Sequence, residues 1–342
     1  MIISMLTHKE GRKYHCQVDM KNYEGVDNLP TPVKIISPKN YSGKTVILYP
    51  GASPDAEQHP KLEMLGLVIA KNGYRVFIPR IPPLKKLDIS EINISWFISF
   101  YYWVIKNYNI KHNNLAVVGI SYGGGLLLKA ILQIRKNNVS PKLIMTYGTF
   151  ADAKSTLNFL ISGEIIIDGI KKYVQPNEWG LIVLFKNYLK KINTDLNTES
   201  ILDVISEHID NNFENRDKLI SKLDRNEKEI TDLLIQGKTN KKIIKLCDLM
   251  LESQQDAIVK LSPFHWCNTI EEKVFIFHGA NDSMVPYTES VKLANKLPNS
   301  ELLISYIYEH KEISTSKGTY FLTKELFRML KFFSNFYLYY EN

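Results

Sequence analysis

One stretch of the sequence, NLAVVGISYGGGLLLKA at residues 114–130, restricts the fold more than any other. It begins with a short apolar run typical of a buried strand, turns tightly at Ser121 and continues as a helix that opens on glycine. Gly119 and Gly123 flank the serine in a G-x-S-x-G pattern. A Cβ at either glycine is expected to collide with the strand or the helix of the turn itself, so both positions require glycine. The pattern predicts a strand–turn–helix unit with a serine at its strained apex.

The serine of this turn is a candidate nucleophile. A helix that starts just beneath it directs free N–H groups and a positive dipole end toward the place where an oxyanion would form. A glycine-rich turn of this kind can also bind phosphate, or it can be structural with no chemistry. The patterns G-x-G-x-x-G and G-x-x-x-x-G-K-[ST] are both absent, and the next expected strand, residues 142–147, has no acidic residue for a ribose. The motif therefore favours catalysis.

The segment resembles the nucleophile elbow of the α/β-hydrolase superfamily, in its serine-nucleophile branch. Gly124 and Gly125 strengthen this resemblance, which covers about residues 40–150 and 262–320. It implies an α/β fold in which a mostly parallel central sheet is flanked by helices. The serine at the apex argues against relatives that use aspartate to open epoxides or remove halides, because those reactions need a carboxylate nucleophile.

Hydrophobic periodicity around the elbow agrees with such a fold. Trp96, Phe100 and Trp103 recur at helical spacing and predict a helix whose broad apolar face packs in the core, rather than an aromatic ligand cage. The other expected elements are antiparallel edge strands within 14–36, strands at 45–49, 74–79, 273–277 and 302–308, and helices at 62–71, at 290–297 and from about 322 onward.

The expected strand at residues 45–49 is followed by Pro50-Gly51-Ala52. In the superfamily this strand usually ends in His-Gly-X, and the resemblance implies that the backbone N–H of X is half of an oxyanion hole. Here proline replaces the histidine, while Gly51 and Ala52 match. The implied donors are the N–H groups of Ala52 and of Tyr122, which follows the serine. A plain strand-ending Pro-Gly turn is the alternative for this segment.

Residues 151–262 differ from the rest of the chain in amino-acid composition and in hydrophobic periodicity. No proline occurs between Asn177 and Ser262, and glycine nearly vanishes. Apolar residues recur there with amphipathic-helix spacing, at Ile201, Val204, Ile205, His208 and Ile209 and again at Ile243, Leu246, Cys247, Met250 and Leu251. We expect this block to be all-helical, and the resemblance implies a cap inserted between the sixth and seventh strands. The predicted organisation is a hydrolase core of residues 1–150 and 263–342 with an inserted cap of residues 151–262.

The first part of the insertion, residues 157–185, is richer in apolar residues than the helices that follow. It could line an acyl pocket or touch a membrane surface. Apolar helix faces are usually buried, so packing of the cap onto the core is the favoured interpretation. Residues 211–228 are rich in Lys, Glu, Asp and Asn and are expected to form solvated helix faces.

A serine hydroxyl is a poor nucleophile at neutral pH, so it needs a base, usually histidine, which in turn needs a carboxylate. In the superfamily the order is Ser, acid, His, each after a successive core strand. Asp282 matches the acid position in the pattern H-G-x-x-D-x-x-V-P, and His310 matches the base position just past the last strand. Together with Ser121 they are the expected catalytic triad.

Each partner of the serine has an alternative interpretation. Asp282 could be a turn residue only. His310 could be a surface histidine, and Glu309 precedes it where the superfamily commonly has glycine. Asp152 is an alternative acid, because some relatives place the carboxylate after the sixth strand. His278 is interpreted as structural, at the end of a strand.

Composition places further limits on function and location. Cys16, Cys247 and Cys267 form no C-x-x-C pair and suggest free thiols in a reducing compartment. The N-terminus lacks the features of a signal peptide, and the longest uncharged run, residues 92–105, is too short to span a membrane, so a cytoplasmic location is expected. The formal net charge of +7 comes mainly from scattered lysines without a basic stripe, which gives nucleic-acid binding little support.

These observations predict a serine hydrolase that cleaves an ester, thioester or other small acyl substrate through an acyl-enzyme, with no metal and no organic cofactor. An acyltransferase with the same triad is a close variant. A peptidase is less favoured, because no propeller or other accessory domain is recognisable. A non-catalytic binding protein on a hydrolase scaffold is the alternative from another class. The substrate and its chain length, the choice between hydrolysis and transfer, the mobility of the cap, the oligomeric state and the pathway stay open.

Overall fold

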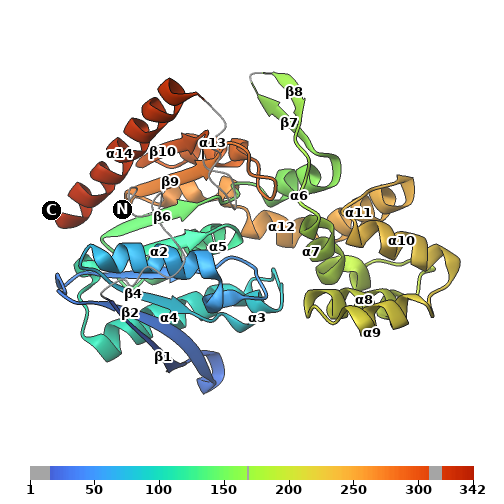
Figure 1. The fold of residues 1–342 in the computed structure, drawn as a ribbon, viewed down its shortest axis with the longest axis horizontal. Helices are drawn as coiled ribbons and strands as arrows, with labels where there is room; N and C mark the ends of the chain where they lie inside the picture. The colour runs from blue at the N-terminus through green and yellow to red at the C-terminus, as the bar shows by residue number, and fades with distance from the viewer. Residues whose placement is uncertain (1–15, 168, 308–317) are drawn as a thin grey trace.

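An eight-stranded sheet runs through the middle of the molecule in the order β1-β2-β4-β3-β5-β6-β9-β10 (Figure 1). The structure, a computed structural model, describes residues 16–167, 169–307 and 318–342. The strands are β1 (Cys16–Glu24), β2 (Pro30–Pro38), β3 (Thr45–Tyr49), β4 (Arg75–Pro79), β5 (Leu115–Ile120), β6 (Leu143–Tyr147), β9 (Val274–Gly279) and β10 (Ser300–Ser305). β1 and β2 are antiparallel to their neighbours, and all other pairs are parallel. The mostly parallel sheet and its antiparallel opening strands are therefore confirmed.

The central strands are buried along nearly their whole length because helices cover both faces of the sheet. Every residue of β3 is buried, and so are all but the last residues of β5 and β6. The core helices are α2 (Pro60–Lys71), α3 (Pro82–Lys85), α4 (Ile92–Tyr108), α5 (Tyr122–Arg135), α13 (Tyr287–Lys296) and α14 (Thr319–Glu341). One apolar cluster joins the sheet to α4, α5 and α13, and a second joins it to α2 and α14.

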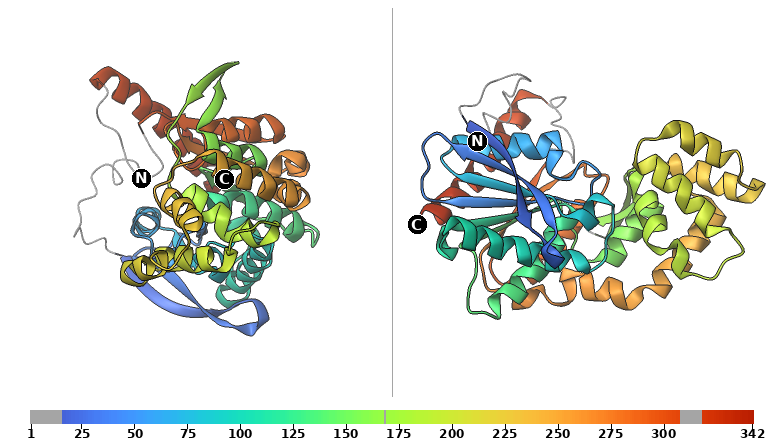
Figure 2. Two further views of the ribbon diagram at one scale, coloured as in Figure 1. Left: turned by 90° about the vertical axis from the view of Figure 1, so that its right-hand side faces the viewer. Right: turned by 90° about the horizontal axis from the view of Figure 1, so that it is seen from below.

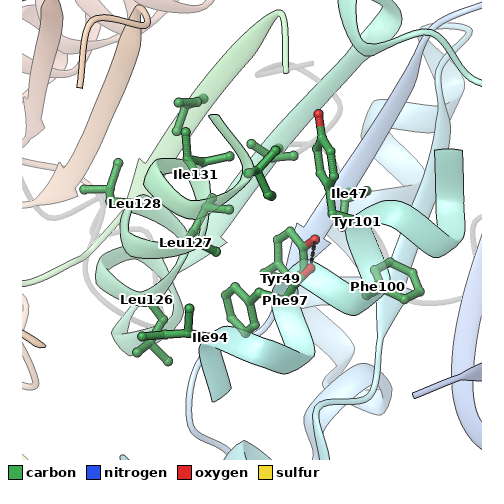
Figure 3. Packing of buried hydrophobic residues seen from close by; sticks show 14 of the residues in the cluster. Ile47, Tyr49, Ile94, Phe97, Phe100, Tyr101, Leu126, Leu127, Leu128 and Ile131 are labelled. Atoms are coloured by element: carbon green, nitrogen blue, oxygen red, sulfur yellow. Dashed lines mark hydrogen bonds between the residues drawn. The ribbon is translucent and has the colours of Figure 1, made fainter. Parts of the chain in front are cut away.

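The aromatic face of α4 lies in the first of these clusters, as expected. The rings of Tyr49 and Phe97 stack with their centroids 4.3 Å apart, and the Tyr49 hydroxyl donates to the Phe97 carbonyl at 2.8 Å (Figure 3). Phe100 packs edge-on to Tyr49. Burial of these rings on β3 and α4 fixes the strand that leads to residues 50–52, the predicted oxyanion loop.

One hydroxyl group near the end of the last helix bonds to the backbone where two core strands begin. Tyr340 is fully buried, and its hydroxyl lies 2.6 Å from the Thr45 carbonyl and 2.8 Å from the Asn114 carbonyl. The Thr45 N–H donates to the same hydroxyl at 3.0 Å. A single side chain of α14 thus satisfies backbone groups where β3 and β5 begin.

We expect Tyr340→Phe to lower the free energy of unfolding by about 1–3 kcal/mol, because it leaves the buried Thr45 and Asn114 groups without a partner. Tyr339→Phe is the matched control, since Tyr339 is partly exposed and adjacent on the same helix. Urea denaturation followed by circular dichroism measures both changes. Equal stability of the two variants would contradict the assigned role of the hydroxyl.

The segment between β6 and β9 forms a separate group of helices at one side of the core (Figures 1 and 2). Its elements are α6 (Ala153–Ser162), β7 (Glu164–Ile167), β8 (Ile170–Tyr173), α7 (Trp179–Tyr188), α8 (Thr198–Ile209), α9 (Phe213–Ile220), α10 (Arg225–Ile235), α11 (Lys241–Ser253) and α12 (Gln255–Leu261). The five apolar residues expected on one face of α11 are buried, as are four of the five expected on α8. None of the residues of α9 is buried, which agrees with a solvated helix.

The expectation of an all-helical insertion is wrong at β7 and β8, which pair as an antiparallel hairpin. α6 ends at Gly163, whose φ of +72° is a left-handed helix stop. The isoleucine run that follows is β-branched and favours a strand, and Gly169, with a φ of +77°, provides the turn. The division of the chain into core and cap domains stays a prediction.

The two chain segments that join the insertion to the core lie against each other. The Ala153 N–H donates to the Ser262 hydroxyl at 2.9 Å, and the Phe264 N–H donates to the Ala151 carbonyl at 2.8 Å. Glu289 of α13, which is buried, accepts from the N–H groups of Ala151 and Asp152. The entry and the exit of the insertion are therefore fixed to the helix that follows the predicted acid.

Within the described parts of the chain, no helix has the length and apolarity required to cross a bilayer.

Candidate active site

Ser121 lies at the apex of the turn between β5 and α5, as the motif predicts. Its φ of +52° and ψ of −127° are a strained conformation for a residue with a side chain. The Ser121 N–H donates to the Tyr147 carbonyl at 2.7 Å, and the Ser121 carbonyl accepts from the Gly124 N–H at 3.0 Å. These two bonds hold the turn between the neighbouring strand and the first turn of the helix.

The flanking glycines are required for two different reasons. A Cβ at Gly119 would lie 2.7 Å from the Gly124 Cα, a collision with the helix of the turn itself, as expected. A Cβ at Gly123 would lie 2.2 Å from the Pro50 carbonyl oxygen, so its clash is with the neighbouring strand end and the expected partner is corrected. Gly123 therefore sets the contact between the elbow and the oxyanion loop.

The loop after β3 approaches the serine closely. A Cβ at Gly51 would lie 3.0 Å from the Cβ of Ser121 and 3.0 Å from the Ile120 carbonyl oxygen, so a side chain there would crowd the elbow. Pro50, the departure from the superfamily pattern, lies in contact with the elbow through its carbonyl. Neither the Ala52 N–H nor the Tyr122 N–H donates a hydrogen bond to another described residue. Both predicted donors thus have no hydrogen-bond partner within the part of the chain that the structure describes, and their role stays a prediction.

The side chain of Tyr122 fixes the start of α5. Its hydroxyl donates to the Ile89 carbonyl at 2.5 Å, and its ring stacks on Phe150 with the centroids 5.2 Å apart. Burial raises the pKa of the Tyr122 phenol far above its usual range, so the group stays a neutral donor. The residue that follows the serine is therefore held at both ends.

A buried ion pair behind the oxyanion loop was not apparent from the sequence. Glu57 is fully buried, and the guanidinium Nε of Arg80 lies 3.1 Å and 3.0 Å from its two carboxylate oxygens. The Arg80 carbonyl in turn accepts from the Tyr23 hydroxyl at 2.6 Å. Glu57 follows the oxyanion loop and Arg80 follows β4, so the pair fixes the loop to the sheet. No local pattern links two residues so far apart in the sequence.

Asp282 lies in the loop after β9, at the predicted acid position, and is 3% exposed. Its Oδ1 accepts from the N–H groups of Met284 and Val285 at 2.8 and 2.9 Å. The other carboxylate oxygen lies 3.5 Å from Nε2 of His278. The loop thus orients the carboxylate through its own backbone.

His278, the penultimate residue of β9, contacts the loop that carries Asp282, which we call the acid loop (residues 280–286). Its Nε2 lies 2.9 Å from the Val285 carbonyl and its Nδ1 lies 2.6 Å from the Ser290 hydroxyl. A carbonyl only accepts, so Nε2 carries a proton and points toward the loop. Both nitrogens have buried protein partners, which agrees with the structural interpretation of this histidine.

We expect His278→Ala to lower the free energy of unfolding by about 1–3 kcal/mol, because Ser290 and Val285 lose a buried partner. His265→Ala is the control, since His265 is exposed. Urea denaturation midpoints of the two variants measure the difference. An unchanged midpoint for His278→Ala would show that the histidine does not hold the loop.

Asp152, the alternative acid, has a structural role. Asp152 is the N-cap of α6, and its Oδ1 accepts from the Lys154 N–H at 2.9 Å. Ser121 follows β5, Asp152 follows β6 and Asp282 follows β9, and these three strands are parallel neighbours in the sheet. The strands β5 and β9 are therefore roughly 10 Å apart, two inter-strand spacings. His310 lies outside the described residues, and its role as the base stays a prediction.

The cysteines are poor candidates for a nucleophile. Burial raises the pKa of Cys247 to about 12 and that of Cys267 to about 11, so both stay protonated near neutral pH. Cys16 is only partly buried, and burial raises its pKa as well. Among the residues that the structure describes, no three His, Cys, Asp or Glu side chains form a group that could hold a metal ion.

A pocket of about 330 Å³ borders Ser121. The core contributes Gly51, Ala52 and the acid-loop residue Met284 to its wall. Trp179 and Val183 of α7 also line it, so the insertion forms part of the site. The sequence predicts that residues 157–185 pack on the core. It does not indicate that Trp179 and Val183 reach the pocket, because their position depends on the path of the whole insertion.

Known proteins match the chain in part of its sequence and in its overall architecture. A family model described as BD-FAE matches residues 217–297, about a quarter of the chain, and this range includes Asp282. A search of curated proteins finds no match. The similar solved structures include an esterase/lipase from an uncultured bacterium, with 12% identity over 99% of this chain and 89% of that chain and a TM-score of 0.51.

Two archaeal structures are similar as well. An esterase from Pyrococcus furiosus has 14% identity over 94% of this chain and 91% of that chain, with a TM-score of 0.50. An acylaminoacyl peptidase from Pyrococcus horikoshii has 12% identity over 96% of this chain, with a TM-score of 0.53. The chain spans 42% of that peptidase and 36–41% of the other peptidases and the puromycin hydrolase that it matches. At these identities the similarity concerns the fold.

Proposed function

We propose that this chain, which has the α/β-hydrolase fold, is a serine hydrolase that cleaves a carboxylic ester or thioester. The observation that carries the proposal is the pairing of a strained Ser121 with two unbonded backbone N–H groups beside it. Backbone strain of this kind persists only where the surrounding structure enforces it, and such positions concentrate at active sites. The apolar pocket at the serine supplies room for a substrate.

In the proposed reaction His310 removes the hydroxyl proton of Ser121 while the serine oxygen attacks the acyl carbonyl carbon. Asp282 orients the histidine and stabilises its charge. The N–H groups of Ala52 and Tyr122 donate to the oxygen as it becomes an oxyanion, a contribution of about 3 kcal/mol per donor. The bond to the alcohol or thiol then breaks, and the leaving group takes the proton from His310. Water attacks the acyl-enzyme in the same way and releases the acid and the free serine.

The likeness to two esterases over their nearly full lengths supports ester cleavage over peptide cleavage. The chain covers 89% and 91% of those esterases but well under half of the peptidases, so the matched peptidases are much longer chains. The BD-FAE match supports the same substrate class. A small carboxylic ester is therefore the proposed substrate.

We expect the purified protein to react with a fluorophosphonate probe and to hydrolyse p-nitrophenyl butyrate. Ser121→Ala removes the attacking oxygen and should abolish both reactions, whereas Ser334→Ala, on the exposed face of α14, should change neither. Gel fluorescence and absorbance at the nitrophenolate band provide the two readouts. Labelling that persists in Ser121→Ala would refute the assignment, and no reaction of the native protein would favour a binding protein on this scaffold.

The partners of the serine are tested by two matched pairs of variants. Asp282→Asn should lower kcat by ~10³-fold or more, because a mispositioned histidine cannot accept the proton, while Asp152→Asn should cost far less. His310→Ala should have an effect as large as that of Ser121→Ala, whereas His265→Ala should have little effect. Kinetics with p-nitrophenyl butyrate distinguish these cases. A larger loss for Asp152→Asn than for Asp282→Asn would transfer the acid role to Asp152.

A further inference from the structure

The pocket at Ser121 extends well beyond the reacting atoms. One part lies under the insertion, where Ala52, Leu87 and Trp179 line it. A second part runs between the sheet and the helices α2 and α14, which cover the same face (Figure 1). We call this second part the apolar arm, and the residues that define it are Val46, Leu65, Ile69, Val118, Met145 and Phe336.

The strand register gives the length of the apolar arm. Val46 on β3 pairs with Ala116 on β5, and Ser121 follows Ala116 by five residues. At ~3.3 Å per residue, the arm reaches roughly 16 Å from the serine along the strands. This depth exceeds what a short acyl group such as acetyl would occupy.

The apolar arm offers hydrocarbon surface rather than hydrogen bonds. Val118 and Met145 form its floor on the sheet, and Leu65 and Ile69 approach from α2. Two of the tyrosine hydroxyls at its far end already have protein partners. Tyr340 bonds to the backbone of Thr45 and Asn114, and Tyr74 bonds to Glu341 at 2.5 Å. A ligand that enters the arm therefore meets mostly hydrocarbon surface.

Protein interiors are close-packed and contain few voids larger than a water molecule. An apolar slot between a sheet and its covering helices forfeits packing that the surrounding side chains could otherwise make. The apolar arm belongs to the pocket that borders Ser121. A hydrocarbon chain that fills the arm restores the missing apolar contacts. The position and the lining of the arm thus indicate which half of the substrate enters it.

We infer that the substrate carries a long hydrocarbon acyl chain, and that this chain lies in the apolar arm with its carbonyl carbon at Ser121. The leaving alcohol or thiol then faces the insertion, beside Trp179 and Leu87. This assignment rests on the proposed serine-hydrolase function and specifies its substrate class. Leu65 of α2, half-buried in the arm wall, is a specificity-determining residue.

The native protein tests this inference with p-nitrophenyl acetate, butyrate, octanoate and laurate, each measured below its micelle-forming concentration. Each buried CH₂ group stabilises the bound acyl chain, so kcat/KM should rise by ~10-fold or more from acetate to octanoate. A series that stays flat or falls with chain length, while the acetate ester is cleaved, would overturn the inference and leave the proposed function intact. If no ester is cleaved and the fluorophosphonate probe does not react, the proposed function fails and the inference fails with it.

A pair of tryptophan variants on α2 locates the chain. Leu65→Trp fills the arm and should reduce the laurate-to-acetate ratio of kcat/KM by at least ~10-fold. Leu67→Trp is the matched control, because Leu67 is also half-buried on α2 but does not line the pocket, and it should keep the native ratio. In the background of Ser121→Ala, Leu65→Trp should also weaken binding of a fluorescent long-chain fatty acid. Equal ratios and equal fatty-acid binding in the two tryptophan variants would place the acyl chain elsewhere.

Discussion

The candidate site depends on the contact between the elbow and the end of β3. Gly123 lies so close to the Pro50 carbonyl that no side chain fits between them. The parallel register of β3 and β5, with Tyr49 opposite Gly119, brings the two strand ends to the same level. This contact holds the loop that carries Ala52 against the elbow, and the proposed pair of oxyanion donors requires the two loops to be held together. The proline at this position preserves the approach, because the contact is made by its carbonyl.

Four buried polar side chains with hydrogen-bonded partners hold the surrounding loops in place. The Glu57–Arg80 pair fixes the oxyanion loop, His278 and the backbone of Met284 and Val285 fix the acid loop, and Glu289 fixes the entry to the insertion. Buried charges are costly unless they are paired and hydrogen-bonded, so these groups restrict each loop to one arrangement. The sheet forms a rigid base, and the polar pairs fix the conformations of the loops that carry the candidate site residues.

Much of the fold could be predicted because its signals are local. The strand–turn–helix pattern at Ser121 and the amphipathic spacing in α8 and α11 lie within short windows of sequence. The β7–β8 hairpin was missed because its isoleucine run is short and lies within a long helical block. The Glu57–Arg80 pair, the clash partner of Gly123 and the apolar arm could not be predicted, since each depends on segments that meet only in the folded chain. The position of Asp282 after β9 agrees with the expected acid, while His310 lies outside the described residues and stays a prediction.

The central claim is that Ser121 is an activated nucleophile, and identification of the modified residue tests it most directly. The native protein would be treated with a fluorophosphonate, digested and mapped by tandem mass spectrometry. We expect a single stoichiometric adduct on Ser121. An adduct on Ser53, which lines the same pocket, or the absence of any adduct on an intact folded protein would contradict it.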